Sequence, residues 1–211
     1  IRNGIAITNK YDYSAGPFPT LQISASTPII WMNPAEVYFL RAEGALRGWN
    51  MGADAKTCYE NGVKTSFAVS GVSTTADAYL ANATSLPAGY IDPRNNGNNV
   101  DATSAILSKI TIRWEPTALF EANLERIITQ KWIAMFPDGQ EAWTEFRRTA
   151  YPKVFPVVVN NSGGLINTTT QIRRLPFPST EYQNNANGIA KAISLLGGAD
   201  NGGTKLWWDK K

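Results

Sequence analysis

The two acidic residues with the best spacing for catalysis in this sequence are Glu141 and Glu145. They are four residues apart, so on a predicted helix both carboxylates lie on one face, one turn from each other. Glycoside hydrolases hold their two carboxyl groups across a cleft, about 5 to 9 Å apart and usually on separate elements. Two acids on one helix are more typical of partners for a basic side chain such as Arg148, or of a solvated helix face, and we expect one of these roles here.

Other catalytic and metal-binding chemistry has little support in the sequence. The chain has no histidine, which excludes Ser-His-Asp triads, Cys-His pairs and histidine metal sites. The single Cys58 cannot form an intrachain disulfide, and we expect it to be a small buried side chain. Asp92 and Asp101 flank an Asn-rich run that could offer oxygen ligands to a cation, but this run lacks the regular acidic spacing of a calcium loop. We therefore predict no enzyme, no metal site and no cofactor.

Two arginine pairs, Arg147 with Arg148 and Arg173 with Arg174, could bind an anionic ligand, because guanidinium groups grip carboxylates and sulfates bidentately. The alternative is structural: these arginines bind backbone carbonyls and internal acids and so fasten loops to helices. We favour the structural role, since an arginine at a helix end already has carbonyl partners. The net charge of +3 is spread without a basic run, which argues against nucleic-acid binding.

Aromatic side chains are the best candidates for ligand contacts, because flat apolar faces of sugars stack on aromatic rings while polar neighbours fix their orientation. Trp132 and Trp143 lie on predicted amphipathic helices, so we expect them in the core, and we expect Trp49 to be packed. The candidate ligand-binding residues are Trp31 with Tyr11 and Tyr13, and Tyr90 with Arg94 and Asn96 from a long polar loop.

These residues require a frame, and the sequence predicts a helical one of 211 residues, enough for one domain. Asn33 and Asp54 are placed to cap two helices joined by a short turn, which must then lie antiparallel. The first carries two apolar stripes, which predicts burial on two sides. Alternating apolar residues at 110–114 predict either a brief strand or an extended entry into the next helix. Further helices are predicted at residues 75–83, 118–136, 140–149 and from Ser179 to about Leu195.

Three stretches, in this order and spacing, resemble the SusD/RagB superfamily. They are residues 128–136 (ITQKWIAMF), residues 141–152 (EAWTEFRRTAYP), and residues 173–181 (RRLPFPSTE) with the tail at 206–209 (LWWD). The segment at residues 36–44 (EVYFLRAEG) is similar to an upstream repeat helix of that family. Members are about twice as long as this chain and begin at a lipidated cysteine, so the resemblance predicts that residues 1–211 are the C-terminal portion of a single SusD-like domain whose N-terminal half is missing.

The resemblance implies a mostly α fold of tetratricopeptide-like helical hairpins with long, loop-rich insertions that form the binding face. It also implies a non-enzymatic subunit, held at the cell surface of the outer membrane by a lipid anchor that this chain lacks. Such a subunit captures an oligosaccharide, or in some members a peptide, and delivers it to a SusC-like TonB-dependent transporter. Two alternatives stay open at this point: a glycoside hydrolase, and a helical-repeat adaptor that binds only proteins.

Overall fold

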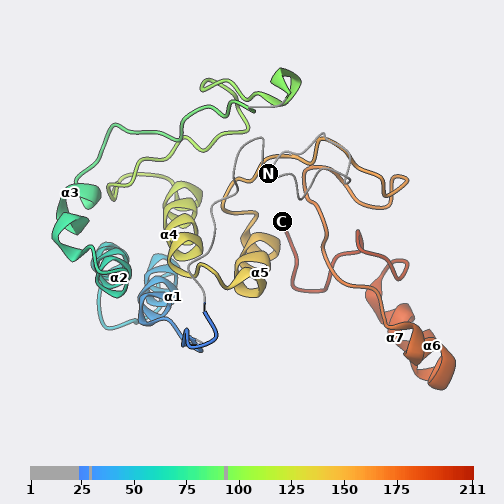
Figure 1. Cartoon of the computed structure of the whole chain (residues 1–211). Coiled ribbons are helices and arrows are strands. Elements are labelled where there is room, and N and C mark those ends of the chain that lie inside the picture. The colour runs from blue at the N-terminus through green and yellow to red at the C-terminus, as the bar shows by residue number, and fades with distance from the viewer. Residues whose placement is uncertain (1–23, 29, 93–94) are drawn as a thin grey trace.

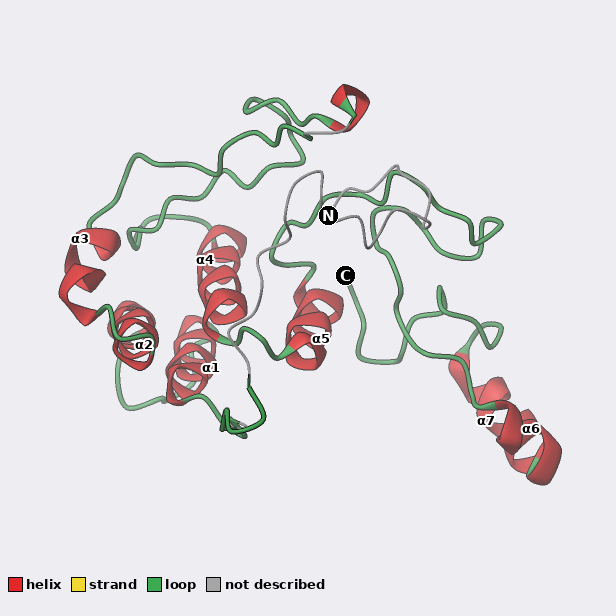
Figure 2. Ribbon diagram, in the orientation of Figure 1, coloured by secondary structure: helices red, strands yellow, loops and turns green. Residues whose placement is uncertain are grey.

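The computed structural model describes residues 24–28, 30–92 and 95–211, and in these ranges the chain forms helices and loops but no strand (Figures 1 and 2). One isolated antiparallel bridge joins Tyr90 to Val100. None of the described helices has the length and apolarity needed to cross a membrane. The elements are α1 (Pro34–Leu46), α2 (Ala55–Val69), η3 (Ser73–Thr75), α3 (Ala76–Leu80), η4 (Asn96–Asn98), α4 (Phe120–Ala134), α5 (Gly139–Thr149), α6 (Ser179–Asn184) and α7 (Ala186–Leu196).

The predicted hairpin of α1 and α2 is confirmed, and its two caps form as expected. The Asn33 side chain accepts a hydrogen bond from the Ala35 amide at 3.0 Å, and the Asp54 carboxylate accepts one from the Thr57 amide at 2.7 Å. Asn33 also donates to the Ala134 carbonyl at 2.8 Å. The cap of α1 therefore also binds the end of α4, far away in sequence.

The core lies where α1, α2 and α4 pack together. Its fully buried members include Phe39, Tyr59 and Ile127. Gly62 allows the close approach of α2 to α1, because a Cβ at this position would lie only 2.8 Å from the Phe39 ring. The Tyr59 hydroxyl donates to the Ile112 carbonyl at 2.6 Å, which fastens the chain entering α4 to the hairpin. Cys58 is buried among these residues, as predicted.

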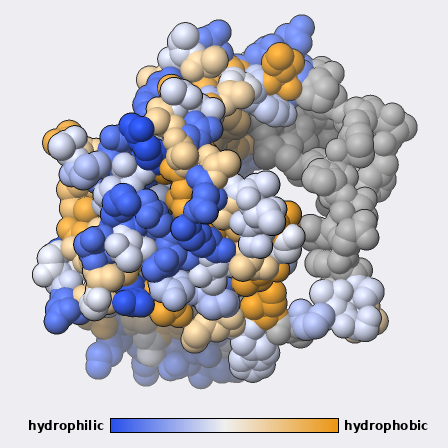
Figure 3. Space-filling view, turned by 90° about the vertical axis from the view of Figure 1, so that its left-hand side faces the viewer, coloured by the Kyte–Doolittle hydropathy of each residue, from blue (hydrophilic) through white to orange (hydrophobic). Residues whose placement is uncertain are grey.

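Loops make up much of the molecule, and most of them lie on one side of the helices (Figure 1). The segment between α3 and α4 runs out from the helices and returns, while α6 and α7 form a small hairpin that projects from the far end (Figures 1 and 2). On the side of α2 and α3, the surface is covered mainly by hydrophilic side chains (Figure 3). The exposed ion pairs Lys56–Glu60 and Lys64–Asp77 lie there. That face is a solvated edge of the helical layer.

Of the two alternatives for residues 110–114, the strand does not form, and the segment is irregular chain leading toward α4. The Arg113 amide donates to the Asn82 carbonyl, and the described residues offer no neighbouring strand to extend this single contact. The prediction of one long C-terminal helix is wrong. The helix predicted from Ser179 to Leu195 is broken at Asn185, whose backbone leaves the helical region (φ −143°, ψ 46°) and whose side chain caps α7 by accepting from the Gly188 amide. Asparagine side chains compete with the backbone in this way.

Three burial predictions are also wrong. On α1, the stripe that begins at Val37 and Leu40 is 43% and 48% exposed, so the helix is buried on one side rather than two. Trp132 is 42% exposed and Trp49 is 63% exposed, although both were expected to be packed. Periodicity places a residue on a face of a helix, but it does not say how far the neighbouring elements extend along that face.

Candidate functional site

Glu141 and Glu145 on α5 share one cation, the ammonium group of Lys131 on α4. The ammonium group lies 2.7 Å from the Glu141 carboxylate and 2.8 Å from that of Glu145, while Glu36 on α1 approaches to 3.3 Å. The Lys131 side chain is only 1% exposed. Burial alone would lower the pKa of Lys131, but the surrounding carboxylates outweigh it and raise that pKa. The two acids form an internal ion-pair network, not an opposed catalytic pair.

A second part of this network joins α5 to α1 through Arg148. Its guanidinium donates to both oxygens of Glu43, each at 2.6 Å, and to Glu145 at 2.6 Å. Arg47 binds the same Glu43 carboxylate at 2.8 Å. Burial would raise the pKa of Glu43, but Arg148 and Arg47 lower it. The structural interpretation of Arg148 is confirmed.

Arg147 and Arg173 hold the C-terminal tail against α5. Arg173 is 2% exposed and forms a bidentate ion pair with the buried Asp209. Arg147 donates to the Arg173 carbonyl at 2.9 Å, and Arg173 donates to the Arg147 carbonyl at 2.7 Å. The Arg147 guanidinium also lies 3.6 Å from the Trp143 ring centre and 4.9 Å from that of Trp208. These contacts leave neither arginine pointing at a ligand.

Arg174 has a similar structural role at the base of the α6–α7 hairpin. It forms an ion pair with Asp200, an internal acid of the kind expected for the structural role. The Tyr182 hydroxyl donates to the other oxygen of Asp200 at 2.6 Å, and the Phe177 amide donates to the same carboxylate. Asp200 therefore joins the chain before α6 to the chain after α7.

Of the six predicted ligand contacts, Trp31, Tyr90 and Asn96 lie in the described part of the chain. Trp31 is 95% exposed just before α1, and Asn96 is exposed in η4. Tyr90 is half-buried, with its ring 5.7 Å from that of Phe155. The segment before α1 and the long loop lie on opposite sides of the helices, so the structure does not bring these groups together (Figure 1). The remaining predicted contacts, which lie outside the described residues, are Tyr11, Tyr13 and Arg94.

The Asn-rich part of the long loop is held by its own side chains. The Asp92 carboxylate accepts from the Asn95 amide at 3.1 Å and from the Asn98 side chain at 2.9 Å, and Asn99 accepts from the Asp92 amide. Asp101 instead accepts from Thr103. No group of three or more acidic or cysteine side chains that could hold a metal ion occurs within the described ranges.

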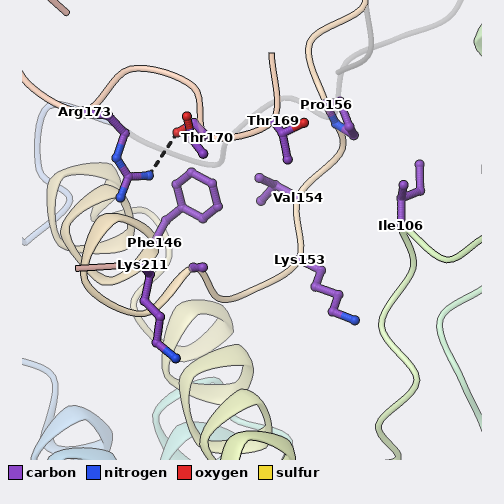
Figure 4. Close-up of a pocket in the computed structure, with 10 residues that line it drawn as sticks. Ile106, Phe146, Lys153, Val154, Pro156, Thr169, Thr170, Arg173 and Lys211 are labelled. Atoms are coloured by element: carbon purple, nitrogen blue, oxygen red, sulfur yellow. Dashed lines mark hydrogen bonds between the residues drawn. The ribbon is translucent and has the colours of Figure 1, made fainter. Parts of the chain in front are cut away.

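The structure adds a pocket that the sequence did not reveal, at the junction of the loops with the end of α5 (Figure 4). Its volume is about 210 Å³. The residues that line it come from the long loop, α5, two later loop segments and the tail: Ile106, Phe146, Ala150, Lys153, Val154, Pro156, Thr169, Thr170, Arg173 and Lys211. Only Arg173 had been considered as a ligand contact, because the other residues gather through tertiary structure rather than through a motif.

Residues 1–209 match the SusD-like family, described as "Susd and RagB outer membrane lipoprotein". The chain belongs to the SusD-like family. The SusD-like proteins are binding proteins rather than enzymes, and their helices form tetratricopeptide-like hairpins, so the predicted fold class and family are confirmed.

Solved SusD homologues are similar over most of this chain. A chitin-binding SusD homologue from Flavobacterium johnsoniae is 52% identical with a TM-score of 0.80, covering 86% of this chain and 36% of its own. A SusD homologue from Bacteroides thetaiotaomicron is 48% identical with a TM-score of 0.80, covering 90% and 40%. One from Bacteroides uniformis is 47% identical with a TM-score of 0.83, covering 90% and 39%.

This SusD-like chain therefore spans 36% to 40% of the length of these three solved relatives. A search of curated proteins finds no match.

Proposed function

We propose that this protein captures an oligosaccharide and does not cleave it. The observation that carries the proposal is the 52% identity to a SusD homologue that binds chitin. The ion pairs of Lys131 with Glu141 and Glu145 support binding without cleavage, because the two acids with the best spacing for catalysis are already paired with a cation inside the fold. A chitin oligosaccharide is accordingly the first ligand to test.

We place the binding face on the loops rather than on the helical layer. The long loop exposes Asn96 and carries Tyr90, and Trp31 offers an exposed ring at a separate position. Amide groups and aromatic rings are the side chains that orient and stack sugars. The helices supply a rigid frame for these loops, because the buried ion pairs of α1, α4 and α5 join these helices to each other.

Alanine substitutions test these contacts one at a time. Asn96→Ala and Trp31→Ala each remove an exposed side chain. The two residues lie on opposite sides of the helices, so each variant tests a separate contact, and the change at a true contact should weaken binding of chitohexaose without lowering the melting temperature. Loss of one stacking ring should cost about 0.5 to 1.5 kcal/mol, or roughly 2- to 12-fold in affinity. Trp207→Ala, which removes an equally exposed ring (82%) from the tail, is the control. Unchanged affinity in both variants would remove these residues from the site.

The cellular role follows from the family. Its members are described as outer membrane lipoproteins, and we propose that the protein carrying this chain is lipid-anchored at the cell surface and passes its ligand to a SusC-like TonB-dependent transporter. We also propose that residues 1–211 are the C-terminal portion of a single SusD-like domain. Co-purification of a barrel transporter with the full chain from detergent-solubilised outer membranes would support the partnership, and its consistent absence would count against it.

A further inference from the structure

The loop-junction pocket has walls that are fastened to each other. The Gln171 side chain donates to the Phe155 carbonyl at 3.1 Å, and the Val157 amide donates to the Thr168 carbonyl at 2.9 Å. These bonds join the wall at residues 153–157 to the wall at residues 168–171. Behind them, Arg173 donates to the Thr170 carbonyl at 3.0 Å (Figure 4). A pocket built this way is preorganised, because little chain entropy is lost when a ligand enters.

Backbone strain is concentrated at the same place. Among the described residues, the two non-glycine residues with positive φ are Ala150 at 63° and Gln171 at 57°. Ala150 lines the pocket, and Gln171 supplies the bond between its walls. Left-handed backbone in such residues costs free energy and is often kept at ligand-binding sites.

The lining of the pocket is mostly apolar, with a few polar groups that have no internal partner. Phe146, Val154 and Ile106 present hydrocarbon surface to the cavity (Figure 4). The hydroxyl groups of Thr169 and Thr170 have no hydrogen-bond partner in the part of the chain that the structure describes. A ligand group that fits must therefore combine an apolar portion with groups that can bond to a hydroxyl.

The charged groups around the pocket do not point into it. The side chains of Lys153 and Lys211 extend away from the Phe146 ring (Figure 4). Lys211 also binds Glu121 at 2.7 Å, and Arg173 is paired with Asp209. An anionic group in the pocket would lose its hydration without gaining a direct ion pair, which is unfavourable.

We propose that the loop-junction pocket recognises the acetamido group of an N-acetylated sugar. The acetyl methyl packs against Phe146 and Val154, and the threonine hydroxyls bond to the amide. The volume of about 210 Å³ admits one sugar substituent or ring but not a chain of sugars. An unsubstituted sugar would bring a hydroxyl instead, which could bond to a threonine hydroxyl but would leave the apolar lining without a contact. This inference rests on the proposed capture of a glycan, and it assigns the recognition of one chemical group to one pocket.

The test compares chitohexaose with cellohexaose, which is the same neutral chain with a hydroxyl in place of each acetamido group. Calorimetric titration of the full chain should give at least about tenfold tighter binding for chitohexaose, the usual effect of a small apolar group in a fitted pocket. Two isosteric variants, Val154→Thr and Thr170→Val, alter the pocket without changing its volume. Each variant should reduce the preference for chitohexaose over cellohexaose severalfold, and should leave the affinity for cellohexaose unchanged.

Val158→Thr is the matched control, because Val158 is an exposed valine (41%) of the neighbouring loop outside the pocket lining. It should leave the preference intact. A chitohexaose preference that survives both pocket variants with unchanged melting temperatures would overturn the pocket assignment while leaving glycan capture standing. If a uronic-acid oligosaccharide binds more tightly than chitohexaose, and Lys153→Met abolishes that binding, the pocket is an anion site instead. Failure to bind any of these sugars would overturn the proposed function itself.

Discussion

At the scale of single residues, Lys131 is the charge on which the helical frame depends most. Its ammonium group is buried among the carboxylates of Glu36, Glu141 and Glu145. Lys131→Met would remove the cation and leave like charges facing one another. We expect the free energy of unfolding to fall by about 3 to 5 kcal/mol, the cost of breaking a buried pair by removing one partner. Urea titration followed by circular dichroism measures this change.

Lys56→Met is the matched control for that substitution. Lys56 pairs with Glu60 on the solvated side of α2, and its side chain is 54% exposed. Exposed pairs of this spacing contribute about 0.3 to 0.5 kcal/mol. If Lys131→Met and Lys56→Met lower the free energy of unfolding equally, the buried network does not have the structural importance assigned to it.

Ala150 follows the last residue of α5 as its C-cap, and its backbone conformation predicts a stabilising substitution. Its φ of 63° suits glycine better than alanine, since glycine has no Cβ to clash in the left-handed region. We expect Ala150→Gly to raise the free energy of unfolding by up to about 1 kcal/mol. The same substitution at Ala142, inside α5, should lower it by about 0.5 to 1 kcal/mol. Thermal melts of both variants measure the contrast, and a loss of stability at both positions would refute the argument from strain.

At the scale of elements, the contact between α1 and α5 should be sensitive to acid. Arg148 and Arg47 hold the pKa of Glu43 below its ordinary value of 4.5, despite burial. A carboxyl group with a depressed pKa stabilises the fold above its unfolded pKa, and that contribution is lost as the pH falls through the folded pKa. The melting temperature of the wild type should therefore exceed that of Glu43→Gln most clearly above pH 5.

This difference should shrink as the pH falls below about 4.5, because Glu43 in the wild type then becomes protonated like its neutral replacement. Glu60→Gln, which alters an exposed pair on α2, should differ little from the wild type across the same range. A difference between wild type and Glu43→Gln that does not change with pH would contradict the role of the Glu43 charge.

The elements themselves could be predicted from local signals, and the failures have local causes. Asn33 and Asp54 cap their helices because an N-cap depends on only a few neighbouring residues. Asn185 broke a predicted helix because its side chain bonds to the backbone within its own segment. The alternating residues near Ile112 formed no strand because a strand also requires a partner strand, and none occurs among the residues that the structure describes.

At the scale of the whole molecule, the sequence predicted the type of protein better than the position of its site. The family motifs are contiguous, so they could be read directly, and the arginine pairs had recognisable acidic and carbonyl partners. The loop-junction pocket could not be read in this way, because Ile106, Phe146 and Thr170 belong to three separate segments. The exposure of Trp132 and Trp49 was missed for the same reason: it depends on which elements come near.

We propose that this SusD-like protein holds a glycan without reacting with it. The most direct measurement is equilibrium titration of the full chain with chitohexaose, followed by chromatography of the recovered sugar after prolonged incubation. We predict saturable binding and recovery of the hexasaccharide intact. Absence of binding, or the appearance of shorter sugars that scale with protein concentration, would contradict the claim.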